Sequence, residues 1–411
     1  PMHGAAFGVA GTSLLLAALL LAAPPAGAQQ PLTRSEAIAA ALARAPRIGI
    51  ARADSQIAQA QLLTARTRPN PILASGYSKS TPQYRFAVDL PLDLPTLRNA
   101  RVGAARAGLS AALYRFRYDR ALLVLDADTA YTRAAAARAR AGLAERNVRG
   151  ADRLRAIAVA RRDAGDASDL DVELATIFAG QQANLAAADS LALFQATSAL
   201  QLILGLSADP PVIVAVDSLT PVPYGTPPSA YRGAEPLPVL AAAATLEAAE
   251  FTARLQRRQW LAGLSVNAGF EMHDPATGNR PLPTAGINIP LQIFNRNRGP
   301  IAEADALRDR ARFALELARL ESRNQLASAM RALEAALARV ERGQRLVASA
   351  TRVVEMSVTA YQEGAATLTT VLETQRNARD ILTQLTNDLA EAWVAAALVR
   401  ALAPPADGTT R

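Results

Sequence analysis

The chain has 411 residues, of which 44 are lysine or arginine and 36 are aspartate or glutamate, giving a formal net charge of +8. It has no cysteine, which excludes disulfides, thiolate metal ligands and cysteine nucleophiles. Aromatic residues make up only 5% of the sequence, and alanine, leucine and arginine dominate it, which favours long helices over a compact mixed core. The basic residues are scattered among acidic ones and do not predict a nucleic-acid-binding patch.

The first 28 residues are typical of a secretory signal peptide. An apolar run at residues 14–21 is followed by a proline pair and by the small residues Ala26-Gly27-Ala28. We therefore expect residues 1–28 to be removed on export. No later segment reaches the roughly 18 unbroken apolar residues of a membrane-spanning helix.

The sequence after the signal peptide begins with a helix signal. Thr33 and Glu36 have the spacing of a capping box, in which a hydroxyl and a carboxylate satisfy the first free amides of a helix. An alanine-rich helix is predicted from there to about Arg68, where the sequence Pro-Asn-Pro ends it. Residues 71–92 then predict a β-hairpin, because apolar and polar side chains alternate over Tyr84–Leu90. Its first strand is the weaker match.

A proline-free stretch from Pro95 to Pro210 predicts two long helices joined by a sharp turn. Gly165 is expected to end the first helix in a left-handed conformation, and Ser168 to cap the second. Residues 207–238 hold eight prolines and are expected to form a linker on the outside of the helices.

The second half of the chain repeats the first with an offset of 199 residues. Asp89-Leu90-Pro91-Leu92 recurs as Asn288-Ile289-Pro290-Leu291, Gly165 as Gly364, Val172 as Val371, and Phe194 as Trp393. We interpret this pattern as an internal duplication.

The two structural repeats would be residues 29–206 and 239–403. The second would hold a helix, a β-hairpin at 261–294, with alternation over Leu264–Glu271 and Ile287–Leu291, and a helical hairpin with its tip near Gly364. Thr367 is the expected N-cap of the returning helix. Residues 404–411 are expected to be a disordered tail.

The long helix before Gly364 has a coiled-coil pattern. Alternating steps of four and three connect Leu326, Met330, Leu333, Leu337, Val340, Gln344, Val347, Thr351, Val354, Val358 and Tyr361. Such spacing predicts a seam of about five heptads. A helix from Pro300 to Gly364 would be roughly 95 Å long at 1.5 Å per residue.

Four strands are too few to close a barrel, and an open sheet leaves edges that a membrane does not tolerate. Each predicted strand has one apolar face and about the length of a tilted membrane strand. We therefore expect several chains to contribute four strands each to one closed barrel. The predicted fold class is mostly α with a small β part, with long coiled-coil hairpins and four β-strands per chain.

In their order and spacing, these motifs resemble the TolC family of outer-membrane efflux proteins. The similarity is carried by Thr33-Arg34-Ser35-Glu36-Ala37-Ile38, Arg68-Pro69-Asn70-Pro71, Ile289-Pro290-Leu291, Phe294-Asn295-Arg296-Asn297-Arg298-Gly299, Tyr361-Gln362-Glu363-Gly364 and Val371-Leu372-Glu373-Thr374-Gln375-Arg376. It spans about residues 32–403. The run that ends at Gly299 is most similar to the heavy-metal branch, which exports cobalt, zinc and cadmium or copper.

The resemblance implies the exit duct of a tripartite efflux system. The fold would be a homotrimer with a 12-stranded barrel in the outer membrane and an α-helical tunnel in the periplasm. Its partners would be a periplasmic adaptor protein and an inner-membrane pump of the RND type, and no nucleic acid. The strand-to-helix junctions would lie at Pro91, Pro290 and Gly299.

The resemblance also implies a gate at the hairpin tips, where an acidic ring and a tyrosine help to set the closed state. Spacing from the tip glycines places these positions at Asp171, Glu373 and Tyr361. Two positions depart from the family pattern, because a second acidic ring position falls on Thr370 and the gate arginine falls on Ala366. As alternatives, Asp171 and Glu373 are ordinary exposed carboxylates and Tyr361 is a seam residue.

Adaptor docking would involve the turn residues of both tips, which are Gly165, Ser168, Gly364 and Thr367. The alternatives in function are a periplasmic adaptor or structural coiled-coil protein, and the outer-membrane component of type I protein secretion. An adaptor would have one helical hairpin between lipoyl-like and β-barrel domains, whereas this sequence predicts two hairpins. Metal ions, drugs and polypeptides all remain open as cargo.

The sequence gives little support to an enzyme. After the signal peptide it holds a single histidine, His273, so one chain cannot assemble a histidine-based catalytic pair. Met272-His273-Asp274 has metal-ligating side chains, but such a trio in an exposed turn is more often only a turn. We expect no catalytic residues, no cofactor and no resident metal.

Overall fold

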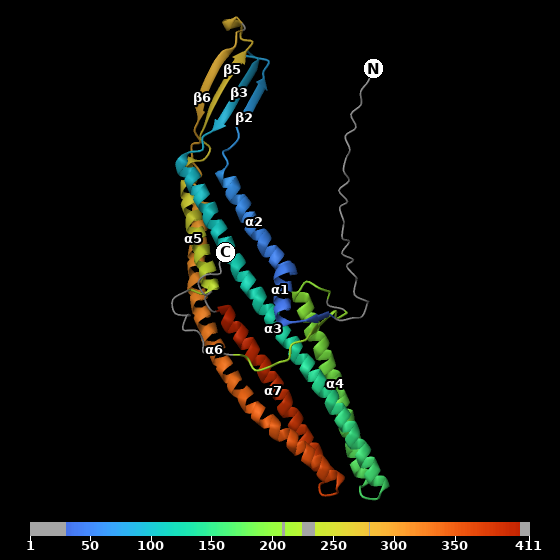
Figure 1. Ribbon diagram of the computed structural model, residues 1–411. Coiled ribbons are helices and arrows are strands. Elements are labelled where there is room, and N and C mark those ends of the chain that lie inside the picture. The colour runs from blue at the N-terminus through green and yellow to red at the C-terminus, as the bar shows by residue number, and fades with distance from the viewer. Residues whose placement is uncertain (1–29, 208–209, 224–234, 279, 403–411) are drawn as a thin grey trace, which may run out of the picture.

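The chain forms a long bundle of helices with a β-sheet at one end and the tips of two helical hairpins at the other (Figure 1). The computed structural model describes residues 30–207, 210–223, 235–278 and 280–402. The expected signal peptide at 1–28 and tail at 404–411 lie outside these ranges. Among the described residues, none of the helices combines the length and the hydrophobicity needed to cross a membrane.

The N-terminal helical segment is broken in two. Helix α1 spans Arg34–Arg44 and α2 spans Pro46–Arg66. The predicted capping box of Thr33 and Glu36 is confirmed. The prediction of one helix to Arg68 is wrong, because Pro46 has no amide hydrogen to continue α1 and instead occupies the first position of α2.

Two very long helices run along most of the molecule. They are α3 (Pro95–Asp163) and α6 (Arg298–Gln362), with 69 and 65 residues. At 1.5 Å per residue each is about 100 Å long. Helix α3 turns back into α4 (Asp169–Ile203), and α6 turns back into α7 (Leu368–Leu402), which gives two antiparallel hairpins. Helix α5 (Leu237–Arg258) and the short helices η2 (Gln259–Leu261) and η3 (Pro275–Thr277) complete the helical part.

The sheet at the far end contains β2 (Ile72–Tyr77), β3 (Tyr84–Pro91), β5 (Ser265–Met272) and β6 (Leu282–Asn288). Its order is β2-β3-β5-β6 and all its pairs are antiparallel. The central pair therefore joins the two halves of the chain. The predicted alternation through Leu291 ends early at Asn288, since Pro290 cannot donate a hydrogen bond to a neighbouring strand.

A second, smaller sheet was not predicted from the sequence. Strand β1 (Gln30–Leu32) pairs in parallel with β4 (Ile213–Ala215). The four predicted strands all lie in the large sheet, and β1 and β4 are two further strands that the sequence did not predict. Strand β4 lies inside the expected linker of residues 207–238, so part of this linker is tied to the start of the described chain. Strands of three residues are too short to produce a periodic signal.

The buried seam of α6 differs from the predicted one at every second position, where the residue just before the predicted one faces the seam. Leu333, Val340 and Tyr361 are buried as predicted, but Ala329 is buried in place of Met330 and Ala336 in place of Leu337. The shifted positions are all small: Ala329, Ala336, Gly343, Ala350 and Ser357. Residues 199 positions earlier are Ala130, Ala137, Ala144, Ala151 and Ala158, which are also small.

Small residues at the seam allow the helices to approach closely, and this explains the shift. A Cβ atom added at Gly343 would lie 3.1 Å from Cδ1 of Leu385 on α7. Larger side chains such as Met330 are therefore placed beside the seam. A hydrophobic pattern alone selects the bulky neighbour and misses the alanine.

Candidate functional site at the hairpin tips

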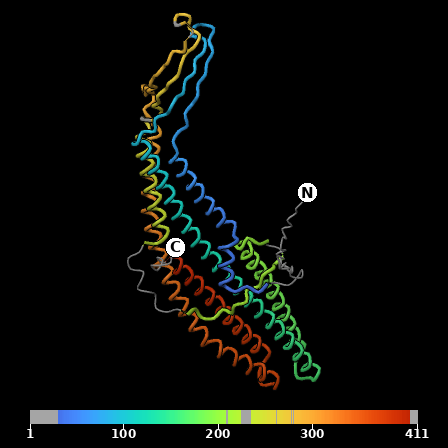
Figure 2. The backbone as a smooth tube through the Cα atoms, turned by 45° about the horizontal axis from the view of Figure 1, so that its top comes forward, coloured from blue at the N-terminus to red at the C-terminus, as the bar shows by residue number. Residues whose placement is uncertain are grey.

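Both hairpin tips lie at the end of the molecule opposite the β2-β3-β5-β6 sheet (Figures 1 and 2). Gly165 and Gly364 have φ angles of +84° and +77°, which favour glycine. The turns have the same hydrogen bonds, because Asp166 N donates to Arg161 O at 2.8 Å and Ala365 N donates to Ala360 O at 2.8 Å. Each tip is thus a tight helix end of the Schellman type.

The returning helices begin with hydroxyl caps. The Asp171 amide donates to Ser168 Oγ at 3.3 Å, and the Asp171 carboxylate accepts from the Ser168 amide at 3.4 Å. In the second tip, the Thr370 amide donates to Thr367 Oγ1 at 3.4 Å. Asp171 and Thr370 therefore occupy the same position in two equivalent caps, and the capping role of Asp171 was not foreseen from the sequence.

A buried cluster joins the two hairpins just inside the tips. It contains Leu154 of α3, Phe178 of α4, Tyr361 of α6, and Leu368 and Val371 of α7. Tyr361 is 2% exposed, and its hydroxyl has no hydrogen-bond partner among the described residues. We call this group of side chains the tip cluster.

Arg161 makes a polar contact between the hairpins close to the turns. Its guanidinium lies 4.7 Å from the centroid of the Tyr361 ring, and its Nη1 donates to the Tyr361 carbonyl. Its Nη2 donates at 3.1 Å to the carbonyl of Asp166 in its own turn. Burial raises the pKa of Tyr361, and the negative charge of Asp171 raises this pKa further. Of the predicted gate positions, Tyr361 is thus buried in the tip cluster, whereas Asp171 caps α4.

A second contact of the same kind runs in the opposite direction. Arg376 of α7 lies 5.9 Å from the ring centroid of Phe178 on α4, and its Nη2 donates to Gln181 Oε1 at 3.5 Å. Each hairpin thus places an arginine over an aromatic ring of the other. This use of Arg161 and Phe178 was not predicted, because the partners are about 200 residues apart in the sequence.

The tips are acidic although the whole chain is basic. Residues 161–173 contain two arginines and five carboxylates, and residues 360–373 contain two carboxylates and no basic residue. Glu373 is exposed on the second turn of α7. In the part of the chain that the structure describes, no group of three metal-ligating side chains lies close enough to hold an ion. The tips therefore concentrate negative charge at one end of a basic chain.

A cavity of about 540 Å³ lies between the hairpins beside the tip cluster, whose members Leu154 and Phe178 help to line it. All four hairpin helices line it, with Arg146 and Arg153 from α3, Glu355 from α6 and Arg379 from α7. The two hairpins are thus in contact at the tip but not continuously along their length.

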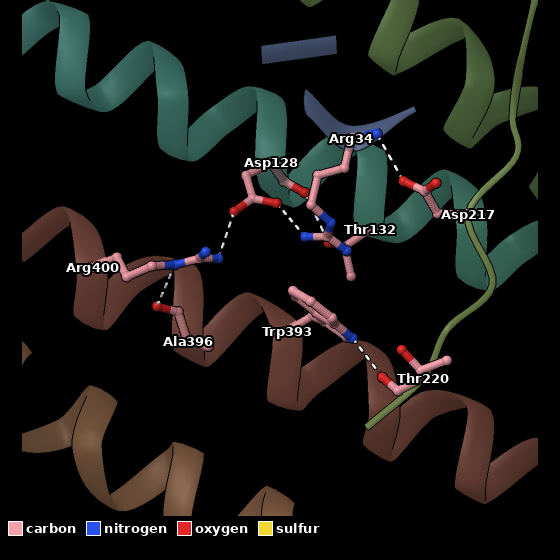
Figure 3. Close-up of polar contacts among 8 residues, drawn as sticks. All are labelled: Arg34, Asp128, Thr132, Asp217, Thr220, Trp393, Ala396 and Arg400. Atoms are coloured by element: carbon pink, nitrogen blue, oxygen red, sulfur yellow. Dashed lines mark hydrogen bonds and ion pairs between the residues drawn. The ribbon is translucent and has the colours of Figure 1, made fainter. Parts of the chain in front are cut away.

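Farther from the tips, a buried aspartate binds both ends of the described chain (Figure 3). Asp128 of α3 is 4% exposed and accepts from Arg34 Nη1, at the start of α1, and from Arg400 Nη2 at 2.9 Å, near the end of α7. The Arg34 guanidinium also lies 3.9 Å from the ring centroid of Trp393. We call Arg34, Asp128, Trp393 and Arg400 the central clamp.

The linker between the two halves is tied to this clamp. The Trp393 indole N–H donates to the Thr220 carbonyl at 2.8 Å, and the Arg34 amide donates to Asp217 Oδ2 at 2.8 Å. The buried Tyr131 hydroxyl donates to the Leu32 carbonyl at 2.9 Å and accepts from the Asp217 amide at 3.1 Å. Residues 217–220 therefore connect α1, α3 and α7 at one level of the molecule.

The expected junction residues lie where the sheet meets the helices. Pro91 is the last residue of β3, Pro290 follows β6, and Gly299 lies in the first turn of α6. Asp89 and Asn288, which share a repeat position, touch each other through Asn288 Nδ2 and Asp89 Oδ1 at 3.0 Å.

One junction residue was not predicted. Asn297 precedes α6 with φ +59°, and its side chain donates to the Gln256 carbonyl of α5 at 2.7 Å. It thereby joins the start of α6 to the end of α5. Asparagine adopts the left-handed conformation more readily than most residues. The asparagines of the Asn-Arg-Asn-Arg-Gly run could therefore have indicated a turn before α6.

Residues 236–403 match the family described as "Outer membrane efflux protein". Over 301 residues the chain is 28% identical to the cobalt-zinc-cadmium resistance protein CzcC of Cupriavidus metallidurans. The aligned region covers 70% of this chain and 69% of CzcC.

Two solved structures have the same fold. A structure of CusC, described for conformational changes in folding and transmembrane channel formation, matches with a TM-score of 0.72 at 19% identity, over 90% of this chain and 92% of CusC. The CmeC outer membrane channel of Campylobacter jejuni matches with a TM-score of 0.76 at 15% identity, over 90% of this chain and 85% of CmeC.

Proposed function

We propose that this protein, whose residues 236–403 carry a domain of the outer membrane efflux protein family, is the outer-membrane channel of a tripartite efflux system. The observation that carries the proposal is the β2-β3-β5-β6 sheet at one end of a helical bundle about 100 Å long. One face of this sheet is apolar and largely exposed, and among the described residues neither of its edge strands pairs with a further strand. An exposed apolar face and two open edges favour contact with lipid and pairing with a neighbouring chain.

The two faces of the sheet differ in a way that suits a membrane barrel. One face of β3 and β5 carries Tyr84, Phe86, Val88, Leu90, Val266, Ala268, Phe270 and Met272, as the strand register places them together. The other face carries the ion pair of Arg85 and Glu271 at 2.7 Å and the hydrogen bond of Asp89 and Ser265 at 2.7 Å. We infer that the apolar face meets lipid and the polar face lines the channel.

Closure of the sheet requires more than one chain. The eight residues of β3 extend about 26 Å, close to the ~25 Å apolar band of outer-membrane barrels. Pairing of β6 with β2 of a neighbouring chain removes both open edges. Three chains of four strands form a 12-stranded barrel, and their helical hairpins continue it as a tunnel in the periplasm.

The hairpin tips are the entrance of this tunnel in our proposal. Three copies of the acidic tips, with Asp171 and Glu373 among their carboxylates, surround a narrow axis and favour cations. This charge, together with the similarity to a cobalt-zinc-cadmium resistance protein, supports divalent metal cations as the cargo class. A periplasmic adaptor would dock at the turns of Gly165, Ser168, Gly364 and Thr367, and would connect them to an inner-membrane pump of the RND type.

Fractionation and planar-bilayer recordings test the proposal. The protein should sediment with outer membranes, migrate as a trimer in mild detergent, and conduct ions after reconstitution. A monomeric protein without conductance would contradict the proposed function.

The entrance is tested by divalent cations added to the periplasmic side. In D171N/E373Q the divalent cations should block the channel less strongly, with an apparent affinity lower by up to about tenfold. The effect is limited because exposed charges contribute only modestly to the binding of an ion. The matched control is E341Q, because Glu341 is an exposed α6 carboxylate far from the tip that pairs with Arg345. Equal block in all three proteins would remove Asp171 and Glu373 from the entrance.

A further inference from the structure

We propose that Arg161 holds the two hairpin tips together in the closed channel, through the ring and the backbone carbonyl of Tyr361 and not through the tyrosine hydroxyl. The proposal rests on the proposed function as a channel and names a residue that regulates its entrance. The family's gate arginine position is occupied by Ala366, which has no group that could bind the opposite hairpin. Arg161 comes from the other hairpin and lies at the same level.

The position of Arg161 fits this role. It lies four residues before Gly165, and its contacts connect α3 directly to the last turn of α6. On the sheet side of this contact, the cavity that Arg146 and Arg379 help to line lies between the hairpins. The next polar contact between α3 and the second hairpin is that of Arg140 Nη1 with Asn387 Oδ1 at 2.9 Å, 21 residues earlier in α3.

The chemistry of the contact depends on the aromatic ring. The guanidinium lies 4.7 Å from the ring centroid, within the roughly 6 Å of cation–π interactions. The same guanidinium donates to the Tyr361 carbonyl and to the Asp166 carbonyl, both near C-terminal helix ends where a positive charge is favoured. A planar group with several N–H donors makes these contacts together, which the ammonium of lysine cannot do.

The Tyr361 hydroxyl takes no part in the contact with Arg161. It has no partner among the described residues, and the side chain is 2% exposed, so a neighbouring chain has no access to it. Asp171, the nearest predicted partner, instead caps α4 through the Ser168 amide. Removal of the hydroxyl therefore leaves every contact of Arg161 in place.

Single-channel recordings of four proteins test the proposal: wild type, R161A, R162A and Y361F. Arg162 is the matched control, because it adjoins Arg161 and carries the same charge but pairs with Asp163 at 2.6 Å on its own hairpin. We expect the closed-to-open ratio of R161A to fall about tenfold, the effect of a contact of about 1.4 kcal/mol. R162A and Y361F should keep the wild-type ratio.

The outcomes separate this proposal from the proposed function. If wild type forms no channel at all, the proposed function fails. If wild type conducts and R161A opens no more often than R162A, Arg161 does not hold the tips and the proposal is overturned. It is also overturned if Y361F opens as R161A does, because the hydroxyl would then carry the contact. Trimer formation in mild detergent, measured for each variant, excludes a folding defect as the cause of opening.

Discussion

The central clamp and the tip contact join the same two hairpins by different means. At the clamp, the buried Asp128 binds two arginines. The neighbouring linker accepts two further hydrogen bonds, from the Trp393 indole and from the Arg34 amide. At the tip, the polar contact nearest the turns is that of one arginine with a ring and a carbonyl. The clamp thus depends on several interactions around a buried charge, whereas the tip depends on the apolar tip cluster and on two arginines that each lie over a ring of the other hairpin.

This difference indicates which part of the molecule stays fixed and which part moves. Breaking the clamp leaves a buried charge without partners, which is costly. Breaking the tip contact frees Arg161, which is half-buried and reaches water by a side-chain rotation. A channel that opens at its entrance without unfolding needs this combination.

The largest effect is expected when Asp128 is removed. In D128A, Arg34 and Arg400 lose their common partner, and Arg34 stays against Trp393 in a largely buried position. We expect the free energy of unfolding to fall by about 3–5 kcal/mol. The matched control is D126A, since Asp126 pairs with Arg47 at the surface and should cost about 1 kcal/mol or less. Equal unfolding midpoints of the two variants in urea would contradict the clamp.

A smaller effect is expected at Tyr131. In Y131F the Leu32 carbonyl and the Asp217 amide lose the hydroxyl that binds both, which should cost about 1–3 kcal/mol. Burial raises the pKa of Tyr131 to about 12 in the folded protein.

The raised pKa gives this comparison a pH dependence. The unfolded chain ionises Tyr131 near its ordinary value of about 10, so the advantage of wild type over Y131F is complete below that pH. It should shrink as the pH rises through about 12. Urea unfolding of both proteins between pH 8 and the alkaline limit, at about one-unit steps, measures the difference. A constant difference would show that the hydroxyl is not buried as described.

The smallest effect is expected inside the second hairpin. Ser357 and Thr374 share a partly buried hydrogen bond of 2.8 Å, whereas their repeat positions in the first hairpin are Ala158 and Ala175. Because both polar groups are removed together, S357A/T374A should change stability by less than about 1 kcal/mol. The T374V single variant, which leaves the Ser357 hydroxyl without this partner, should be the less stable of the two in thermal unfolding. The reverse order would mean that the hydrogen bond itself stabilises the tip.

The local features of the tips could be predicted from the sequence. Gly165, Gly364 and Ser168 act within a few residues of their own position, so their spacing alone predicts turns and caps. The strands of the large sheet were also predicted, because alternation is a local pattern. The similarity to an efflux family, inferred from ordered motifs, agrees with the match of residues 236–403.

The contacts between distant segments could not be predicted. Asp128 looks like any helix carboxylate until the fold brings Arg34 and Arg400 to it from opposite ends of the chain. Arg161 likewise looks like a solvated arginine, since its partner lies 200 residues later. The role of the second gate residue, Glu373, stays a prediction, as its exposed position fits both an entrance carboxylate and an ordinary helix residue.

Distances between spin labels test most directly that the clamp is fixed and the tip is released. The chain has no native cysteine, so labelled pairs can be introduced at D166C/E363C across the tips and at R133C/E391C near the clamp. Each pair is measured in the wild-type background and with R161A. We expect that R161A broadens and lengthens the tip distance and leaves the clamp distance unchanged. An unchanged tip distance, or an equal change at both levels, would contradict it.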